Sequence, residues 1–167
     1  SIRHRRPARQ ALCSRPPRRP SSYRAVPRGT GRVASALLGL GLAPGDRVGI
    51  WSHNNVEWVL MQLATARVGL ILVNINPAYR TAEVEYALNK VACRALVTMA
   101  SFKTSDYLGM LRELAPEWAH SQPGQLESVT LPHLKTVIWI DEAGQGSDQP
   151  GLLRFSDLLA GGKAGDG

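Results

Sequence analysis

The stretch Leu70-Ile71-Leu72-Val73 is an unbroken apolar run that Asn76-Pro77 closes. A strand without polar alternation is typical of a parallel sheet, because helices cover both faces of such a sheet. We therefore expect a strand at residues 70–74 that is buried on both faces. The rest of the fold prediction follows from what precedes and follows this strand.

Amphipathic helical segments alternate with short apolar runs on both sides of this strand. Further strands are expected at residues 47–51, 94–98 and 136–140, and residues 117–133 are expected to form an irregular loop. Helices are expected at residues 31–42 with an end at Gly41, from a cap at Asn54 or Asn55 to Val68, from a cap at Thr81 onward, from Ser105 or Asp106 to Pro116, and at 156–160. This alternation predicts an α/β fold with three layers and a mainly parallel sheet built from βαβ units.

The composition limits the classes of protein that are possible. The chain has 167 residues and a hydrophobic fraction of 44%, which suits one globular domain. Its cysteines, Cys13 and Cys93, are too few for a disulfide framework. The four histidines have no metal-ligand spacing, so no metal site is expected; they are His4, His53, His120 and His133. The apolar window 56–75 contains Glu57, Gln62 and Arg67, so it predicts no membrane span.

Positive charge is concentrated at the start of the chain. Residues 1–32 hold ten arginines and no acid, whereas the remainder has more acidic than basic residues. We interpret residues 1–21 as a disordered Arg/Pro-rich arm and residues 22–167 as the domain. A basic excess confined to one apolar-poor run predicts no specific nucleic-acid binding.

Residues 1–21 also bear on the cellular compartment in which the protein is found. The chain begins with Ser1, so it is expected to be a piece of something longer. An Arg-rich, acid-free start fits a mitochondrial transit peptide. However, its prolines would break the amphipathic helix that such a peptide needs. The expected location is the cytoplasm, and the mitochondrial matrix is the alternative.

Limited trypsin digestion tests the interpretation of residues 1–21. The arm should be cut first, because a segment with so little apolar surface does not offset roughly 1–2 kcal/mol of backbone entropy per ordered residue. Protection of Arg15, Arg18 and Arg19 while Lys135 is already cut would contradict it.

Candidate chemistry should lie where strands end, at residues 51–54, 74–77 and 99–101. Ser52 and His53 lack the Gly-x-Ser-x-Gly elbow of a hydrolase, so a turn beside a helix cap is the better interpretation. Cys93 is expected to be a buried small hydrophobe. Trp51 and Trp58 are expected to be core aromatics. Gly39-Leu40-Gly41 is expected to end a helix; the glycine motif of a dinucleotide-binding fold would instead follow a strand and begin a helix. No Gly-x-x-x-x-Gly-Lys-[Ser/Thr] sequence occurs, so no phosphate site of the P-loop kind is expected. The residues predict no catalytic residue and no metal ligand, and the cofactor-binding residues are unknown.

Several short motifs in a consistent order resemble the beginning of the AMP-forming acyl-CoA synthetases, a family of the adenylate-forming superfamily. The branch that activates medium-chain fatty acids is the most similar. The resemblance covers residues 22–160 and departs from the family at Ala25 and Pro27, in its opening helix. The motifs are Ser22-Tyr23, Arg32-Val33-Ala34-Ser35-Ala36-Leu37, Gly41-Leu42-Ala43-Pro44-Gly45-Asp46-Arg47-Val48, Asn55-Val56-Glu57-Trp58, Gln62 to Gly69, Val73 to Arg80, Glu83-Val84-Glu85-Tyr86 and Phe102-Lys103-Thr104.

The resemblance implies a parent enzyme that uses ATP, Mg²⁺ and CoA to activate a fatty acid. The Ser/Thr/Gly-rich phosphate loop, the ribose-binding Asp and the C-terminal-domain Lys of the family have no counterpart in these 167 residues. We therefore expect an N-terminal fragment of the adenylate-forming domain that is inactive alone and binds none of these cofactors tightly. No family catalytic residue is carried onto this sequence.

An independent module is the alternative to a ligase fragment. It would be a small non-enzymatic α/β binding protein whose basic arm contacts a polyanion or a membrane surface. Whether the coding sequence continues past Gly167 into a phosphate loop separates the two hypotheses. A complete enzyme of another class is disfavoured, because no nucleophile, base or metal cluster has a workable spacing.

Overall fold

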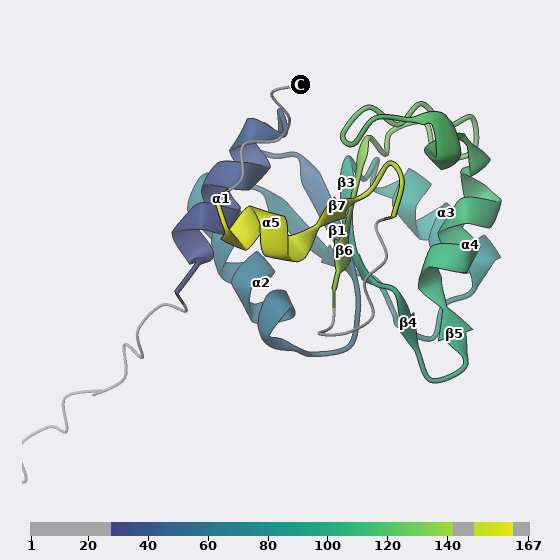
Figure 1. Ribbon diagram of the computed structural model, residues 1–167, viewed down its shortest axis with the longest axis horizontal. Coiled ribbons are helices and arrows are strands. Elements are labelled where there is room, and N and C mark those ends of the chain that lie inside the picture. Colours follow the sequence, from purple (N-terminus) through teal and green to yellow (C-terminus); the bar gives the residue numbers. More distant parts are fainter. Residues whose placement is uncertain (1–27, 142–148, 162–167) are drawn as a thin grey trace, which may run out of the picture.

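A computed structural model describes residues 28–141 and 149–161 (Figure 1). The expected arm at residues 1–21 and the opening segment at 22–27 lie outside these ranges. The statements below concern the described residues.

One parallel sheet organises the domain, with the strand order β2-β1-β3-β6-β7. Every neighbouring pair in it is parallel. The strands are β1 (Arg47–Trp51), β2 (Ile71–Asn74), β3 (Ala95–Met99), β6 (Thr136–Ile140) and β7 (Leu153–Arg154). The four predicted strands and their parallel pairing are confirmed. The pattern did not predict β7, because two residues carry no periodicity.

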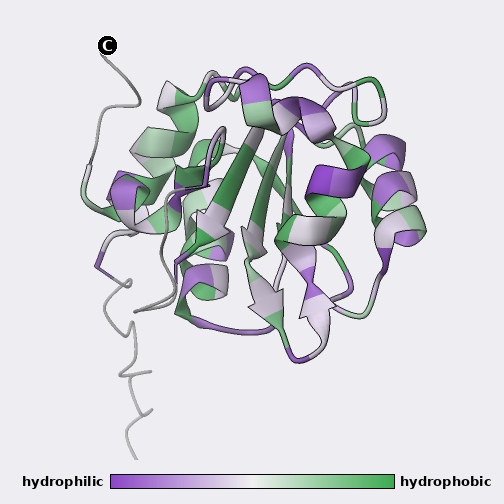
Figure 2. Cartoon of the chain, turned by 45° about the vertical axis from the view of Figure 1, so that its right-hand side comes forward, coloured by the Kyte–Doolittle hydropathy of each residue, from purple (hydrophilic) through white to green (hydrophobic). Residues whose placement is uncertain are grey.

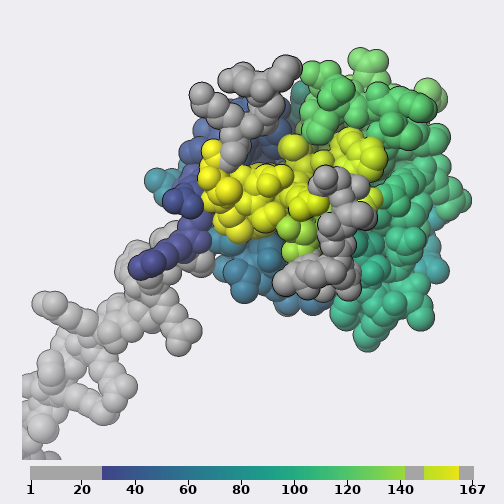
Figure 3. All heavy atoms as spheres, in the orientation of Figure 1, coloured from purple at the N-terminus to yellow at the C-terminus, as the bar shows by residue number. Residues whose placement is uncertain are grey.

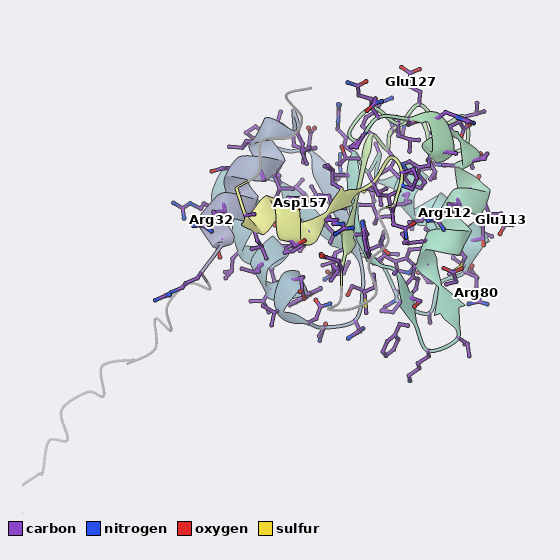
Figure 4. All side chains as sticks on the ribbon, viewed as in Figure 1. Arg32, Arg80, Arg112, Glu113, Glu127 and Asp157 are labelled. Carbon is purple, nitrogen blue, oxygen red and sulfur yellow. The ribbon has the colours of Figure 1, made fainter. Side chains whose placement is uncertain are left out.

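Helices cover both faces of the sheet, which confirms the three layers (Figure 1). One face carries α1 (Thr30–Gly39), α2 (Val56–Val68) and α5 (Phe155–Leu159), and the other carries α3 (Thr81–Lys90) and α4 (Tyr107–Leu114). Figure 2 shows hydrophobic residues concentrated in the strands between these layers. Figure 3 shows α5 lying across the surface beside α1, where Arg32 donates to the carbonyl of Leu159 at 3.2 Å (Figure 4).

The helix ends follow from local chemistry. The side chain of Asn55 accepts a hydrogen bond from the backbone N–H of Trp58, so Asn55 caps α2. Gly69 ends the same helix at a φ of 75°, a left-handed conformation that glycine adopts without strain. At α3 the carboxylate of Glu83 accepts from the backbone N–H of Arg80, which is the cap residue; the expectation that Thr81 caps this helix is wrong, because Thr81 is its first helical residue. None of the helices in the described ranges combines the length and apolar character needed to cross a bilayer.

The expectation that residues 70–74 form a strand buried on both faces is wrong. β2 is an end strand of the sheet, and its residues range from half-buried to exposed; Ile71 is 46% exposed. The reason is topological: the chain goes from β1 to β2 on one side, and then crosses back to place β3 on the other side of β1. An apolar run shows that a strand is covered by helices, but it does not show where in the sheet the strand lies.

Two other segments differ from the prediction. Residues 117–120 lie in the segment predicted to be an irregular loop, but Pro116–His120 form a 3-10 helix, η1, that buries Trp118. Two-residue strands β4 (Ser101–Phe102) and β5 (Ser105–Asp106) form a small antiparallel hairpin after β3. Elements this short are set by tertiary packing, so the sequence pattern does not indicate them.

Gly49 allows close packing at the centre of the sheet. A Cβ built on Gly49 would lie 3.0 Å from Leu96 Cδ1 and 3.1 Å from both Cys93 Sγ and Ile75 Cδ1. The backbone N–H of Gly49 also donates to Cys93 Sγ at 3.1 Å, and the Cys93 thiol donates to the carbonyl of Ala95 at 3.0 Å. Strand β1 therefore has no room for a side chain at this position.

Replacing Gly49 tests this packing. Gly49→Ala should lower the free energy of unfolding by about 1–3 kcal/mol, because the added methyl overpacks a rigid site. Gly39→Ala is the matched control: a Cβ at this position would meet nothing within 4 Å, so the change should be neutral or stabilise α1 by up to about 1 kcal/mol. Urea denaturation measures both variants, and equal stabilities of the two would contradict the close packing.

Candidate functional site

The strand order reverses direction at β1, since β2 lies on one side of it and β3 on the other. Loops that leave the carboxyl ends of such neighbouring strands diverge and open a crevice, where open α/β sheets bind ligands. The three segments predicted to carry chemistry, residues 51–54, 74–77 and 99–101, all lie at this edge of the sheet. The topology therefore brings the predicted segments together.

Hydrogen bonds connect these loops to one another. Thr98 Oγ1 on β3 donates to the carbonyl of Trp51 at 3.2 Å. Trp51 Nε1 in turn donates to the carbonyl of Asn76 at 3.1 Å, and Trp58 Nε1 donates to Asn74 Oδ1 at 3.2 Å. Two tryptophans, one at the end of β1 and one on α2, thus hold the end of β2 and the loop that follows it.

Tyr107 braces the same region from the first residue of α4. Its hydroxyl donates to the carbonyl of Pro77 at 2.9 Å, and its ring lies 4.4 Å from the ring of Trp51. Burial raises the pKa of the Tyr107 hydroxyl above its ordinary value, which keeps it a neutral donor. The segment that follows β3 also contacts the loop after β1. It leads into the β4–β5 hairpin, where the ring of Phe102 lies 4.4 Å from the ring of His53.

A shallow pocket of about 490 Å³ lies between the loops that follow β1 and β2. Ser52, His53, Asn54, Asn76 and Pro77 are among its lining residues, together with Trp58. Nδ1 of His53 is buried and has no hydrogen-bond partner among the described residues. The lining carries polar groups but no acidic side chain, lysine or arginine, so it is suited to form a wall of a site and not to hold a highly charged group.

The described residues do not by themselves fit the ionic groups that the family resemblance implies. No group of three or more His, Cys, Asp or Glu side chains could hold a metal ion within residues 28–141 and 149–161. The pocket lining also supplies no cation to a triphosphate. We therefore derive no catalytic step through Mg²⁺ or ATP from these residues.

The structure gives each candidate residue a place. Ser52 is buried, accepts from Asn55 Nδ2 at 3.0 Å and donates to the carbonyl of His53, which supports the turn beside a helix cap. Cys93 is buried, and burial raises the pKa of its thiol to about 12, so the thiol remains protonated and unreactive.

Trp51 is in the core as predicted, whereas Trp58 packs at the edge of the core and lines the pocket. Gly41 adopts a φ of 82° after α1, as expected of a glycine that ends a helix.

Sequence reasoning did not identify Thr98, Phe102 or Tyr107 as parts of this region. The sequence contained one weak indication that Thr98 has a special role, since Thr98 is the one polar residue within the apolar strand Ala95–Met99. Phe102 belongs to the motif Phe102-Lys103-Thr104, but neither that motif nor the sequence around Tyr107 indicated a contact with this region, because these contacts join segments that are distant in the sequence.

A family model described as AMP-binding enzyme matches residues 3–154. The chain therefore belongs to the family of AMP-binding enzymes, whose members include acyl-CoA ligases. It is 49% identical over 131 residues to the mitochondrial medium-chain acyl-CoA ligase ACSF2 of Bos taurus, and 48% identical to that of Homo sapiens. A putative acyl-CoA synthetase, YngI of Bacillus subtilis, is 38% identical over 109 residues. The Bos taurus match covers 78% of this chain, which spans about a fifth of the relative's length (20%).

Solved structures agree with this assignment. Acetoacetyl-CoA synthetase from Streptomyces lividans matches 80% of this chain and 19% of its own, with a TM-score of 0.65 and 27% identity. The anthranilate CoA ligase AuaEII, in complex with anthranoyl-AMP, matches 80% of this chain and 21% of its own, with a TM-score of 0.63 and 26% identity. The parallel α/β domain is thus the fold that adenylate-forming ligases have in the corresponding segment.

Removing the Tyr107 hydroxyl tests the connection between the loops. Tyr107→Phe should lower the free energy of unfolding by about 1 kcal/mol and speed amide exchange at residues 75–80, because the carbonyl of Pro77 loses its donor. Tyr86→Phe, which removes a hydroxyl from a side chain that is 65% exposed, should change stability by less than about 0.5 kcal/mol. Unchanged exchange at 75–80 in the Tyr107 variant would show that the hydroxyl does not hold this loop.

Proposed function

We propose that this chain is the N-terminal part of an AMP-forming ligase that converts a medium-chain fatty acid to its CoA thioester. The observation that carries the proposal is the family match over residues 3–154 together with 49% identity to a medium-chain acyl-CoA ligase. The structural similarity to CoA ligases of known structure supports it further.

The proposed reaction of the parent has two steps. The fatty carboxylate attacks the α-phosphorus of ATP, and pyrophosphate leaves as the acyl-adenylate forms. The thiolate of CoA then attacks the acyl carbonyl, and AMP leaves. Both steps place charge on phosphoryl or carbonyl oxygens, which need cationic partners, and the pocket lining contains no lysine or arginine to supply them.

The role proposed for these residues is therefore structural. The sheet positions the loops after β1, β2 and β3, and their hydrogen bonds give a preorganised wall against which the rest of the enzyme could complete a site. Alone, the chain is proposed to be inactive. Nothing in the described part of the chain favours the alternative of a small binding module with a basic arm.

The proposed location is the mitochondrion, since the vertebrate relatives are named as mitochondrial enzymes. The Arg-rich, acid-free residues 1–21 are consistent with this alternative to the cytoplasm. Their prolines remain the argument against it.

Calorimetric titration with Mg-ATP at physiological salt, beside a pyrophosphate-exchange assay with octanoate, tests the inactivity of the chain alone. No micromolar binding and no exchange are expected, because a micromolar complex requires about 8 kcal/mol of net binding energy that a neutral loop wall does not provide. Weak, salt-sensitive association through the arginines of residues 1–32 is compatible with the proposal. Saturable micromolar binding, or exchange that depends on octanoate, would contradict it.

The activity of the parent needs a separate experiment. If the coding sequence continues past Gly167, the longer product should catalyse pyrophosphate exchange with octanoate, and more slowly with acetate or palmitate. Equal rates with all three acids would contradict the medium-chain preference, and no exchange with any acid would contradict the ligase assignment.

A further inference from the structure

β2 has one unpaired edge within the described part of the sheet. The backbone N–H of Ile71 donates to the carbonyl of Asp46, and that of Ile75 to the carbonyl of Ile50, so the odd-numbered residues direct their backbone groups toward β1. Because backbone groups alternate along a strand, Leu72 and Asn74 direct theirs away from the sheet. The strand contains no proline and no charged residue, which are the usual protection of an exposed edge.

An apolar groove of about 630 Å³ follows this edge on the face that carries α3. Val73, Ile75 and Tyr79 line it from β2 and the loop after it, and Tyr86, Ala87 and Lys90 line it from the helix. Ile71 is 46% exposed and Tyr86 is 65% exposed. The open edge and its apolar border thus form one continuous surface, which we name the β2–α3 surface.

The charges of the β2–α3 surface are arranged symmetrically about its middle. Glu83 and Lys90 lie near opposite ends of α3, on the side that borders the groove, and the small residue Ala87 lies between them. A second copy turned by a twofold axis perpendicular to the sheet would bring its own α3 alongside, antiparallel and on the same face. Glu83 of each copy would then face Lys90 of the other.

The backbone of the edge is self-complementary in the same orientation. An antiparallel pair of β2 strands centred on Val73 places Leu72 of one copy opposite Asn74 of the other. These are the two residues whose N–H and C=O groups point outward, so each pair could exchange two ladder hydrogen bonds. An isologous interface requires that one patch complement itself, and here both the backbone and the charges do so.

We propose that the β2–α3 surface is a twofold interface with a second copy of this chain, in which the two sheets join through antiparallel β2 strands. This inference concerns assembly and does not depend on the proposed ligase activity. The self-complementary charges favour a second copy over an unrelated extended peptide, which would have no reason to match Glu83 and Lys90 at once.

Charge reversal tests the interface in the full 167-residue chain. Sedimentation equilibrium across the micromolar range should show a concentration-dependent dimer. Lys90→Glu alone should weaken dimerisation about tenfold or more, since it places carboxylates opposite each other twice. Glu83→Lys should do the same with ammonium groups; because it also removes the acceptor for the Arg80 backbone N–H, circular dichroism must show that α3 is kept. Mixing the two variants should restore the dimer, because each copy then meets the opposite charge.

Two further variants separate this effect from general damage to the fold. Glu113→Lys reverses a charge on α4 (Figure 4), a helix that contributes no residue to the lining of the groove, and should leave the dimer unchanged. Ile71→Lys places a cation on the open edge while its backbone bond to Asp46 is kept, and should give a folded monomer by circular dichroism and sedimentation.

Several results would overturn the proposal. A monomer throughout the concentration range is one, and a dimer that neither reversal weakens is another. Failure of the mixed variants to recover the dimer would exclude the Glu83–Lys90 pairing. If a longer product of the gene stays monomeric where this chain dimerises, another segment of the polypeptide covers the edge, and the second copy is not its native occupant.

Discussion

The close contact of β1 with its neighbours at Gly49 is the constraint on which the rest of the structure depends. Because Gly49 has no side chain, Ile75, Cys93 and Leu96 converge on one point of the sheet, and the Cys93 thiol links the backbone of β1 to that of β3. Parallel strands need crossover helices, so fixing β2 and β3 on opposite sides of β1 also fixes which helices cover which face. The reversal in strand order, and with it the candidate site, follows from that placement.

Local chemistry explains which parts of the fold could be predicted from the sequence. Asn55, Gly69 and Asp106 stabilise helix ends through contacts within a few residues of themselves. The two ends of α2 and the start of α4 could therefore be predicted from the sequence. The edge position of β2 was not, because Leu70 to Val73 would have the same pattern at the centre of a sheet. The η1 helix and β7 were also missed, since burial of Trp118 and pairing with β6 depend on residues far away in the chain.

In the candidate site, too, some features could be predicted from the sequence and others could not. Its position could be predicted, because the ends of parallel strands meet at one edge whatever their side chains. Its internal connections could not, because Tyr107 reaches Pro77 and Thr98 reaches Trp51 only after the sheet has formed. Its chemical character is a neutral wall, and this agrees with the absence of a phosphate loop from the sequence and with the share of the ligases that the chain spans.

β2 connects the candidate site with the proposed interface. Asn74 accepts from Trp58 through its side chain, while its backbone groups point to the open edge, so one residue takes part in both surfaces. The loop that follows, from Ile75 to Pro77, forms one side of the pocket. A second strand paired with β2 would therefore restrict the motion of the residue that begins this loop. Pairing at the edge would add to the order that Trp51, Trp58 and Tyr107 already impose, so assembly and site geometry would be coupled through the backbone of a single strand.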